Sequence, residues 1–264
     1  MDHRLSRRGL FAGAAASALA TVLGGCDSTP GVTATTPGPS IRPPDDNTPV
    51  ALWELSGGFA DAAALALRAP RLVIFGDGEA IADAAYRARL DADQLESLAT
   101  SLTNDLRGPD AQKKPSVTPT IADVPITKVS VWSPAGTLSF SAEGLDELRA
   151  DHRYADALYD ARDRLATVHK SVSAKAQPYL AARVRVVAMP AEDGPADPAP
   201  WPTDVKLPTA DAGGIRKADL DGDAARGAVR ALTRDLDQRG AWPAYRTTDG
   251  ILVRASWRYL LSYE

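Results

Sequence analysis

Cysteine and histidine are almost absent from this sequence of 264 residues, which holds one cysteine and three histidines. The single cysteine, Cys26, cannot form an intramolecular disulfide, so the folded domain must depend on a hydrophobic core. Beyond residue 25 only His152 and His169 remain, and neither has a histidine or glutamate at zinc-ligand spacing on its expected helix. The sequence therefore excludes a disulfide scaffold and offers no zinc motif. We interpret His169, which lies near an apolar helix stripe, as a half-buried structural residue.

Excess positive charge and the short motifs of common enzymes are missing as well. Lysine and arginine number 30 against 34 acidic residues, a formal net charge of −4, which argues against nucleic-acid binding because phosphate recognition needs a basic surface. The patterns Gly-x-Ser-x-Gly, Ser-x-x-Lys and His-Glu-x-x-His do not occur. Gly76 and Gly78 do not form a dinucleotide fingerprint, because Ile81 stands where the third glycine belongs. We expect no cofactor and no nucleic-acid partner.

Long hydrophobic runs are also lacking, since the apolar stretch near the N-terminus is shorter than the roughly 20 residues of a membrane-spanning helix. Residues 1–25 combine a basic start, an apolar run and small residues before Cys26, which is typical of a secretory signal peptide. Arg7 and Arg8, within the run SRRGLF, resemble the twin-arginine export signal. An ordinary secretory signal that happens to hold two arginines is the alternative.

The end of this signal carries a second pattern. Residues 23–26 read LGGC and resemble the bacterial lipobox. That resemblance implies cleavage before Cys26 and attachment of a diacylglyceryl group, with palmitate-like chains, to the cysteine sulfur. Two acyl chains give stable anchoring where one gives only marginal binding. We therefore expect a lipoprotein on the extracytoplasmic face of the cell membrane, with the lipid bilayer as a partner; a chance cysteine is the alternative.

The remainder of the chain falls into two parts. Residues 26–49 are rich in proline, threonine, serine and glycine, a composition that predicts a flexible tether behind the lipidated cysteine. Residues 50–264 carry the periodic apolar patterns and are expected to form a single globular domain. That length is sufficient to bury a core without disulfides.

Alternating and helical patterns in residues 50–264 predict an α+β fold. Turn residues between alternating segments mark three hairpins, at residues 77–78, 133–136 and 249–250. Helical patterns occur in three places, between residues 91 and 108, 151 and 173, and 223 and 239. Asp91 and Gln94 form a capping box for the first of these helices. The whole pattern indicates an antiparallel sheet built from hairpins, with about three helices packed on one face.

The domain also resembles a group of known proteins. Residues 72–81 (LVIFGDGEAI), 235–243 (DLDQRGAWP) and 255–260 (ASWRYL) carry this resemblance. They are similar to secreted or lipid-anchored proteins of high-GC Gram-positive (actinobacterial) bacteria, and the resemblance extends over most of the chain. The composition, rich in alanine, aspartate and arginine, agrees with that group. The resemblance implies an exported protein and transfers no activity.

Four arginines lie on polar-facing positions of expected strands: Arg183, Arg185, Arg254 and Arg258. If these strands are neighbours, the side chains form a basic patch on an acidic protein, and guanidinium groups suit carboxylate or phosphate ligands. The competing interpretation is an ordinary solvated sheet face whose arginines pair with nearby acids. We keep the four arginines as a candidate ligand-binding site.

A calcium-loop pattern begins at Asp219 and continues with Asp221 and Asp223 at its third and fifth positions. The pattern then fails, because Ala224 stands at the position of the turn glycine and Arg230 at that of the bidentate glutamate. Capping of the following helix by these acidic residues is the competing interpretation. The three aspartates are a weak calcium candidate, and no other metal site is expected.

Two functional hypotheses from different classes of protein remain open. The first is a non-catalytic binding or scaffolding module of the cell envelope, which contacts cell-wall glycan or another envelope protein; the anchor, the tether and the missing catalytic motifs favour it. The second is a cell-envelope hydrolase that uses a carboxylate pair, because the 34 acidic residues of the chain allow many pairs. An acidic pair in a deep cleft would favour the hydrolase, and an arginine-lined sheet face would favour binding.

Overall fold

The computed structural model describes residues 43, 45–113, 123–236 and 242–264. The chain divides into two units, Met1–Gly38 and Pro39–Glu264, and every described residue belongs to the second unit. The expected signal peptide, Arg7, Arg8, Cys26 and most of the tether lie outside the described residues and stay predictions. Within the described residues, no helix is long and apolar enough to cross a membrane.

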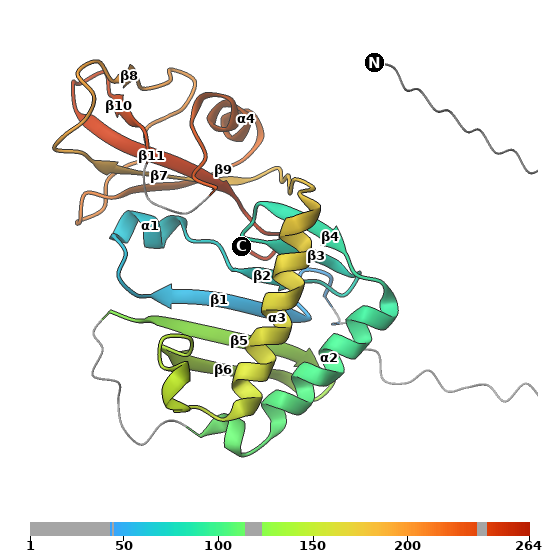
Figure 1. Cartoon of the computed structure of the whole chain (residues 1–264). Helices are drawn as coiled ribbons and strands as arrows, with labels where there is room; N and C mark the ends of the chain where they lie inside the picture. Colours follow the sequence, from blue (N-terminus) through green and yellow to red (C-terminus); the bar gives the residue numbers. More distant parts are fainter. Residues whose placement is uncertain (1–42, 44, 114–122, 237–241) are drawn as a thin grey trace, which may run out of the picture. The chain divides into compact units, whose positions relative to one another are not determined.

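A six-stranded antiparallel sheet occupies the first part of the domain (Figure 1). Its strand order is β4-β3-β2-β1-β5-β6. Along the chain these strands are β1 Ala51–Gly57, β2 Leu72–Ile74, β3 Glu79–Ala82, β4 Tyr86–Arg89, β5 Pro125–Ser133 and β6 Gly136–Glu143. The two hairpins predicted at residues 77–78 and 133–136 are confirmed as the β2–β3 and β5–β6 connections. Gly78 has a φ of +88°, a left-handed conformation that a glycine adopts without strain.

The later part of the chain forms a five-stranded sheet with the order β8-β10-β11-β7-β9. Its strands are β7 Val184–Pro190, β8 Ala199–Pro200, β9 Arg216–Leu220, β10 Ala244–Arg246 and β11 Leu252–Tyr259. Only the short strand β8 pairs in parallel, with β10. The hairpin predicted at residues 249–250 joins β10 to β11 and is confirmed. The register of β7 and β11 places Arg185 directly opposite Arg258.

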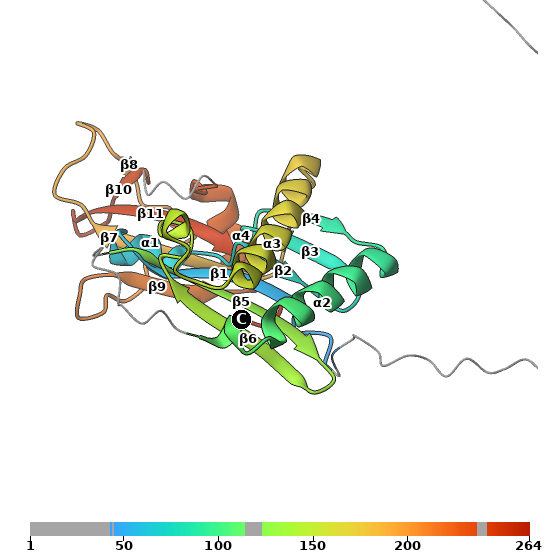
Figure 2. The same cartoon turned by 60° about the horizontal axis from the view of Figure 1, so that its bottom comes forward.

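Helices cover one face of the six-stranded sheet. The α-helices of the described residues are α1 Ala62–Leu67, α2 Ala92–Arg107, α3 Asp156–Lys175 and α4 Gly222–Ala231, and two 3-10 turns are η1 Asp110–Gln112 and η2 Arg149–Asp151. Both views of the ribbon show α2 and α3 against the same face of this sheet (Figures 1 and 2). Ile74, Leu102 and Leu165 are fully buried in the core between them. Burial of each such side chain contributes on the order of 1.5–3 kcal/mol.

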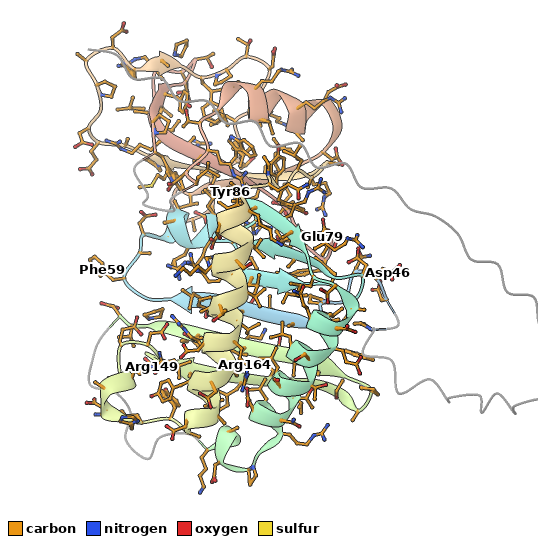
Figure 3. The ribbon with its side chains drawn as sticks, turned by 45° about the vertical axis from the view of Figure 1, so that its right-hand side comes forward. Asp46, Phe59, Glu79, Tyr86, Arg149 and Arg164 are labelled. Atoms are coloured by element: carbon orange, nitrogen blue, oxygen red, sulfur yellow. The ribbon has the colours of Figure 1, made fainter. Side chains whose placement is uncertain are left out.

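A capping box fixes the start of α2, and an ion pair joins the two long helices to each other. Asp91 and Gln94 form the predicted capping box at the start of α2. Arg164 of α3 donates to Asp105 of α2 at 2.9 Å, and Arg164 is labelled on α3 in Figure 3. These contacts leave the opposite face of the six-stranded sheet available for the second layer.

A second core lies on that opposite face. It joins Val73 and Ile81 of the six-stranded sheet to Val186 and Trp257 of the five-stranded sheet, and α4 adds Ala228. A smaller cluster packs α1 on the other side of β7, through Leu67 and Val187. The six-stranded sheet is therefore buried on both faces over part of its width, and α1 lies where the two sheets meet.

The α+β class is confirmed, but its arrangement differs from the expected single sheet. The later strands pair with one another, so the hairpins form two sheets, and α4 packs on the second of them. The third expected helix ends at Ala231 rather than near residue 239. Ser256 Oγ accepts from the Asp235 amide at 2.8 Å and donates to the Thr233 carbonyl at 3.1 Å, which satisfies backbone groups that a helix would have paired. Leu236, which lies beyond the end of this helix, is 48% exposed.

Candidate functional site

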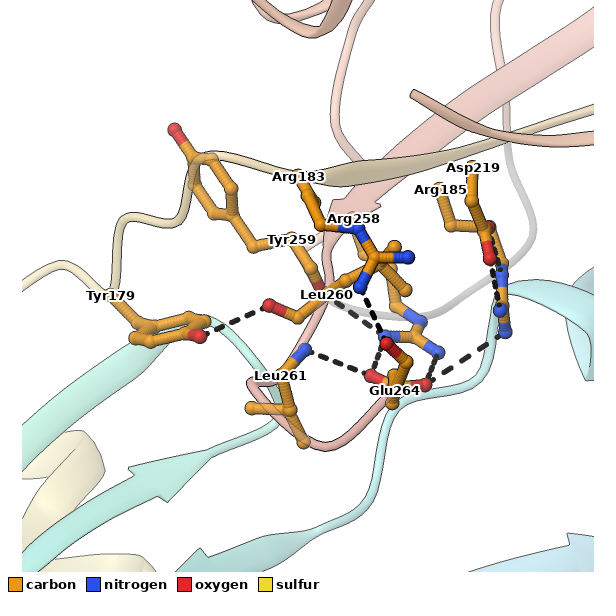
Figure 4. Close-up of polar contacts among 9 residues, drawn as sticks. All are labelled: Tyr179, Arg183, Arg185, Asp219, Arg258, Tyr259, Leu260, Leu261 and Glu264. Atoms are coloured by element: carbon orange, nitrogen blue, oxygen red, sulfur yellow. Dashed lines mark hydrogen bonds and ion pairs between the residues drawn. The ribbon is translucent and has the colours of Figure 1, made fainter. Parts of the chain in front are cut away.

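Three of the four arginines predicted as a ligand site converge on the last residue of the chain (Figure 4). Arg258 donates through both terminal nitrogens to the carboxylate of Glu264, at 2.7 and 2.6 Å. Arg183 donates to the backbone oxygen of Glu264 at 2.5 Å, and Nη1 of Arg185 lies 3.9 Å from Glu264 Oε1. We call these three arginines with Asp219 and Glu264 the arginine–carboxylate cluster.

Carboxylates of the chain itself neutralise this cluster. Arg185 binds Asp219 with two hydrogen bonds, at 2.7 and 2.9 Å. The hydrogen bonds from Arg185 lower the pKa of Asp219. Burial acts to raise the pKa of Glu264, but the hydrogen bonds and charge of Arg258 outweigh it and lower that pKa overall. The pairing with acids matches the competing interpretation, but that interpretation expected a solvated face, and Arg258 is only 5% exposed.

Arg254, the fourth predicted arginine, lies apart from the cluster. It is opposite Met189 in the strand register and donates to the Trp242 carbonyl at 3.2 Å. It also binds Asp193 at 3.0 Å, whose side chain is 93% exposed. The structure thus brings together three of the four residues and separates the fourth.

The weak calcium candidate is not formed by the described residues. Asp219 is occupied by Arg185, and Asp223 pairs with Arg226 while its own side chain is 99% exposed. Asp221 stands at the start of α4 but makes no capping bond with its side chain. In the described part of the chain, no group of three or more histidine, cysteine, aspartate or glutamate side chains could hold a metal ion. The weak calcium candidate at these three residues therefore finds no support in the described part of the chain.

A small pocket lies beside the cluster, at the junction of the two sheets. Its volume is about 60 Å³. Since a water needs roughly 10–15 Å³ of such space, the pocket holds about four waters or a group the size of a carboxylate or phosphate. Apolar side chains form much of the wall, and charged side chains form the rest. We call it the junction pocket; the lining residues that matter most are Leu67, Arg68, Asp83, Arg234, Asp235 and Trp242.

Two arginines of the junction pocket differ from those of the cluster because neither makes an ion pair with any described residue. Arg68 donates to the Gly57 carbonyl at 2.7 Å. Arg234 donates to the Ala84 carbonyl, and its guanidinium lies 5.2 and 5.1 Å from the rings of Trp257 and Tyr259. Burial lowers the pKa of both arginines. Each arginine keeps its charge near neutral pH. The pocket therefore holds two positive charges that form no ion pair with a carboxylate of the described residues.

Two carboxylates also line the junction pocket, and both are engaged. Asp83 accepts from Arg71 at 2.8 Å and contacts His169 Nε2 at 2.7 Å. Asp235 accepts from the indole nitrogen of Trp242 at 2.9 Å. The prediction that His169 is half-buried on its helix is confirmed, since its side chain is 15% exposed. Its partner Asp83 was not foreseen.

The turn that carries Asp83 has an unusual backbone. Asp83 and Ala84 have φ values of +52° and +49°, a left-handed conformation that is costly for residues other than glycine. Asp83 binds Arg71 and His169, while the Ala84 carbonyl receives Arg234. The turn therefore connects the six-stranded sheet and α3 to the pocket arginine.

Comparisons with protein-family models, with curated proteins and with solved structures found no match. The resemblance to actinobacterial envelope proteins therefore stays a prediction. The features of this protein that bear on its function are the junction pocket and the sequence signals at the N-terminus.

Proposed function

We propose that this protein is a membrane-anchored extracytoplasmic lipoprotein that acts as a non-catalytic binding module of the cell envelope. The junction pocket is its binding site, and it receives an anionic group of cell-wall glycan or of another envelope protein. The twin-arginine resemblance at Arg7 and Arg8 and the lipobox ending at Cys26 support the location. The tether at residues 26–49 would let the domain reach away from the bilayer.

The observation that carries the binding proposal is the pair of arginines, Arg68 and Arg234, that make no ion pair with a carboxylate of the described residues. A buried charge without an opposite charge is unfavourable. Among the described residues, Arg234 contacts a backbone carbonyl and aromatic rings, and the half-buried Arg68 contacts a backbone carbonyl. A ligand anion in the junction pocket would supply the missing charge. Each hydrogen bond to a charged group contributes about 1.5–3 kcal/mol. Two such contacts give roughly 3–6 kcal/mol, which barely offsets an association cost of about 4–15 kcal/mol, so they do not hold a ligand by themselves. The natural ligand must therefore also contact surfaces around the pocket.

The hydrolase is the second candidate, because Asp83 and Asp235 line the same pocket. Binding is favoured over it since both carboxylates already have partners, whereas Arg68 and Arg234 make no ion pair with a described residue; Arg258, which also lines the pocket, is paired with Glu264. Asp83→Asn and Asp235→Asn separate the two proposals. A hydrolase would lose its activity on glycan substrates in both variants, while a binding module has no such activity to lose.

Anion binding is tested on the unit Pro39–Glu264, which contains both cores. Thermal melting is followed with acetate, phosphate and acidic sugar fragments at constant ionic strength. A ligand that binds only the folded state raises the melting temperature, so we expect stabilisation of the wild type by at least one anion and its loss in Arg68→Gln and Arg234→Gln. Arg89→Gln serves as the matched control, because Arg89 lies on β4 and binds Asp77. If an anion stabilised the wild type, the two pocket variants and the control variant equally, the junction pocket would be ruled out as the anion-binding site.

The membrane location is tested separately on the full chain. Cys26→Ala should move the protein out of the membrane fraction or leave it unprocessed, because no thiol remains to be acylated. Lysine at positions 7 and 8 should block export if the twin-arginine route is used. Unchanged mass and partitioning of the Cys26 variant would contradict lipidation and would leave the pocket experiment unaffected.

A further inference from the structure

A second and larger hollow lies between α4 and the segment that leads into β7. Its volume is about 360 Å³, and its walls are mainly apolar, formed by Ala182, Val184, Ala225, Val229 and Tyr259. We call this hollow the α4 groove.

Positive charge borders the α4 groove on one side. Arg226 and Arg230 both line it, and they stand one helical turn apart on α4. Arg226 pairs with Asp223, whereas Arg230 has no ion-pair partner in the described part of the chain. Like charges at this spacing repel each other slightly, so a bound anion would relieve that repulsion. The border is cationic although the chain as a whole carries a net charge of −4.

An exposed apolar residue, Leu180, is the sequence neighbour of a residue that lines the groove. Leu180 is 65% exposed and directly precedes the groove residue Ala181. An apolar channel, an exposed leucine beside it and arginines on one border together favour an occupant with a hydrophobic part and a negative end.

The size and polarity of the groove discriminate among such occupants. An α-helix with its side chains is about 10–12 Å across and does not fit into a hollow of this volume. An extended peptide would bury backbone amides and carbonyls against apolar walls that offer few hydrogen-bond partners. An alkyl chain has no polar groups to satisfy and is narrow enough to lie along alanine and valine side chains. We propose that the α4 groove binds the single alkyl chain of an anionic amphiphile, whose carboxylate or phosphate head lies at Arg226 and Arg230.

This site is independent of the junction pocket and of the proposed function. Titration calorimetry on the unit Pro39–Glu264 tests it with dodecanoate and dodecyl phosphate, both below their micelle concentrations. We expect binding of at least one of them, weakened by at least about tenfold in the double variant Arg226→Gln with Arg230→Gln, since loss of a charge-assisted contact changes affinity by that order. Dodecyltrimethylammonium should not bind. The head group preferred identifies a fatty acid or a phospholipid as the source.

Matched variants separate groove binding from general charge attraction. Arg89→Gln with Lys128→Gln removes the same charge from exposed positions of the six-stranded sheet and should leave affinity unchanged. Val229→Trp, at a half-buried position of α4, should fill the groove and abolish binding of the alkyl chain, with circular dichroism confirming the fold. Absence of binding by either anionic amphiphile would overturn the proposal. Equal weakening in the control double variant, or full binding in Val229→Trp, would also overturn it.

Discussion

Arginines in two neighbouring parts of the domain are compensated in different ways. In the arginine–carboxylate cluster, Arg258 is 5% exposed and binds both carboxylate oxygens of Glu264. In the junction pocket, the contacts with described residues are to backbone carbonyls for Arg68 and Arg234 and to aromatic faces for Arg234. The same residue type therefore serves to hold the chain end against the sheet in one place and leaves charge available to a ligand in the other. A structural cluster therefore differs from a candidate site in what its arginines contact, carboxylates in the first and backbone carbonyls or aromatic rings in the second.

The largest effect is expected from removing the carboxylate of the cluster. Glu264→Gln leaves the buried guanidinium of Arg258 without its opposite charge, and the loss of one partner of a buried pair costs about 3–5 kcal/mol. Urea denaturation of the unit Pro39–Glu264 measures this change. Glu147→Gln is the control, because it makes the same substitution at an exposed position between β6 and η2. It should change the unfolding free energy by less than about 0.5 kcal/mol.

A double variant decides whether that loss comes from the unpaired charge. Arg258→Met combined with Glu264→Gln removes both members of the pair and keeps much of the buried volume. Because an apolar replacement of a buried ion pair is often tolerated, we expect the double variant to be more stable than Glu264→Gln alone. A double variant less stable than the single one would show that packing, and not charge, dominates at this site.

The second prediction concerns acid. The folded-state pKa of Glu264 is lowered from its ordinary value of 4.5, with the bonds from Arg258 outweighing burial, and that of Asp219 is lowered from 3.8 by Arg185. A carboxyl with a lowered folded-state pKa stabilises the fold fully above its unfolded-state pKa, and that stability is lost as the pH falls through the folded-state pKa. Stability should therefore decline below about pH 4.5 as these carboxylates protonate.

Comparison of two proteins isolates the contribution of Glu264 to that decline. Denaturation free energies of the wild type and Glu264→Gln are measured from pH 7 down to acid conditions. The gap between the two should narrow as the pH falls, because a protonated glutamate and a glutamine are then both neutral. A gap that stays constant over this range would mean that the charge of Glu264 contributes nothing.

Much of the fold was accessible from the sequence, and the reasons are local. The three hairpins were found because Asp-Gly turns and period-two alternation depend on neighbouring residues. The start of α2 was found because Asp91 and Gln94 lie three residues apart. The partition into two sheets was missed, since it depends on pairing between strands distant in sequence, such as β7 with β11. The end of α4 was missed because Ser256, from a distant strand, supplies the competing hydrogen bonds.

The candidate site was less accessible than the fold. The alternation of strand residues placed Arg183, Arg185 and Arg258 on one face correctly, but Glu264 as their shared partner could not be read from the sequence. Neither Arg68 nor Arg234 carried a sequence signal. Arg68 directly follows the short apolar helix α1, and Arg234 was assigned to the third expected helix, which in the structure ends at Ala231. What distinguishes them is that neither makes an ion pair with a described residue, although Asp83 and Asp235 line the same pocket, and only three-dimensional packing reveals this.

The third prediction tests the pocket arginine for stability as well as for binding. Arg234→Met removes a charge that burial disfavours and also removes the stacking on Trp257 and Tyr259. These effects oppose each other, and a methionine keeps part of the packing, so we expect a change within about 1 kcal/mol in urea denaturation. A loss as large as that of Glu264→Gln would show that Arg234 is structural, and the contrast between the two parts of the domain would disappear.

The smallest effect is expected at Arg254, which resembles the cluster arginines in sequence but not in surroundings. Its ion-pair partner Asp193 has a side chain that is 93% exposed, and such surface pairs contribute about 0–1 kcal/mol. Arg254→Gln should therefore change the unfolding free energy by at most about 0.5 kcal/mol in urea denaturation, well below the effect at the cluster. A loss comparable to that of Glu264→Gln would instead assign weight to its bond with the Trp242 carbonyl. Arg254 would then stabilise the wall of the junction pocket through Trp242, and the pocket would depend on the sheet arginines after all.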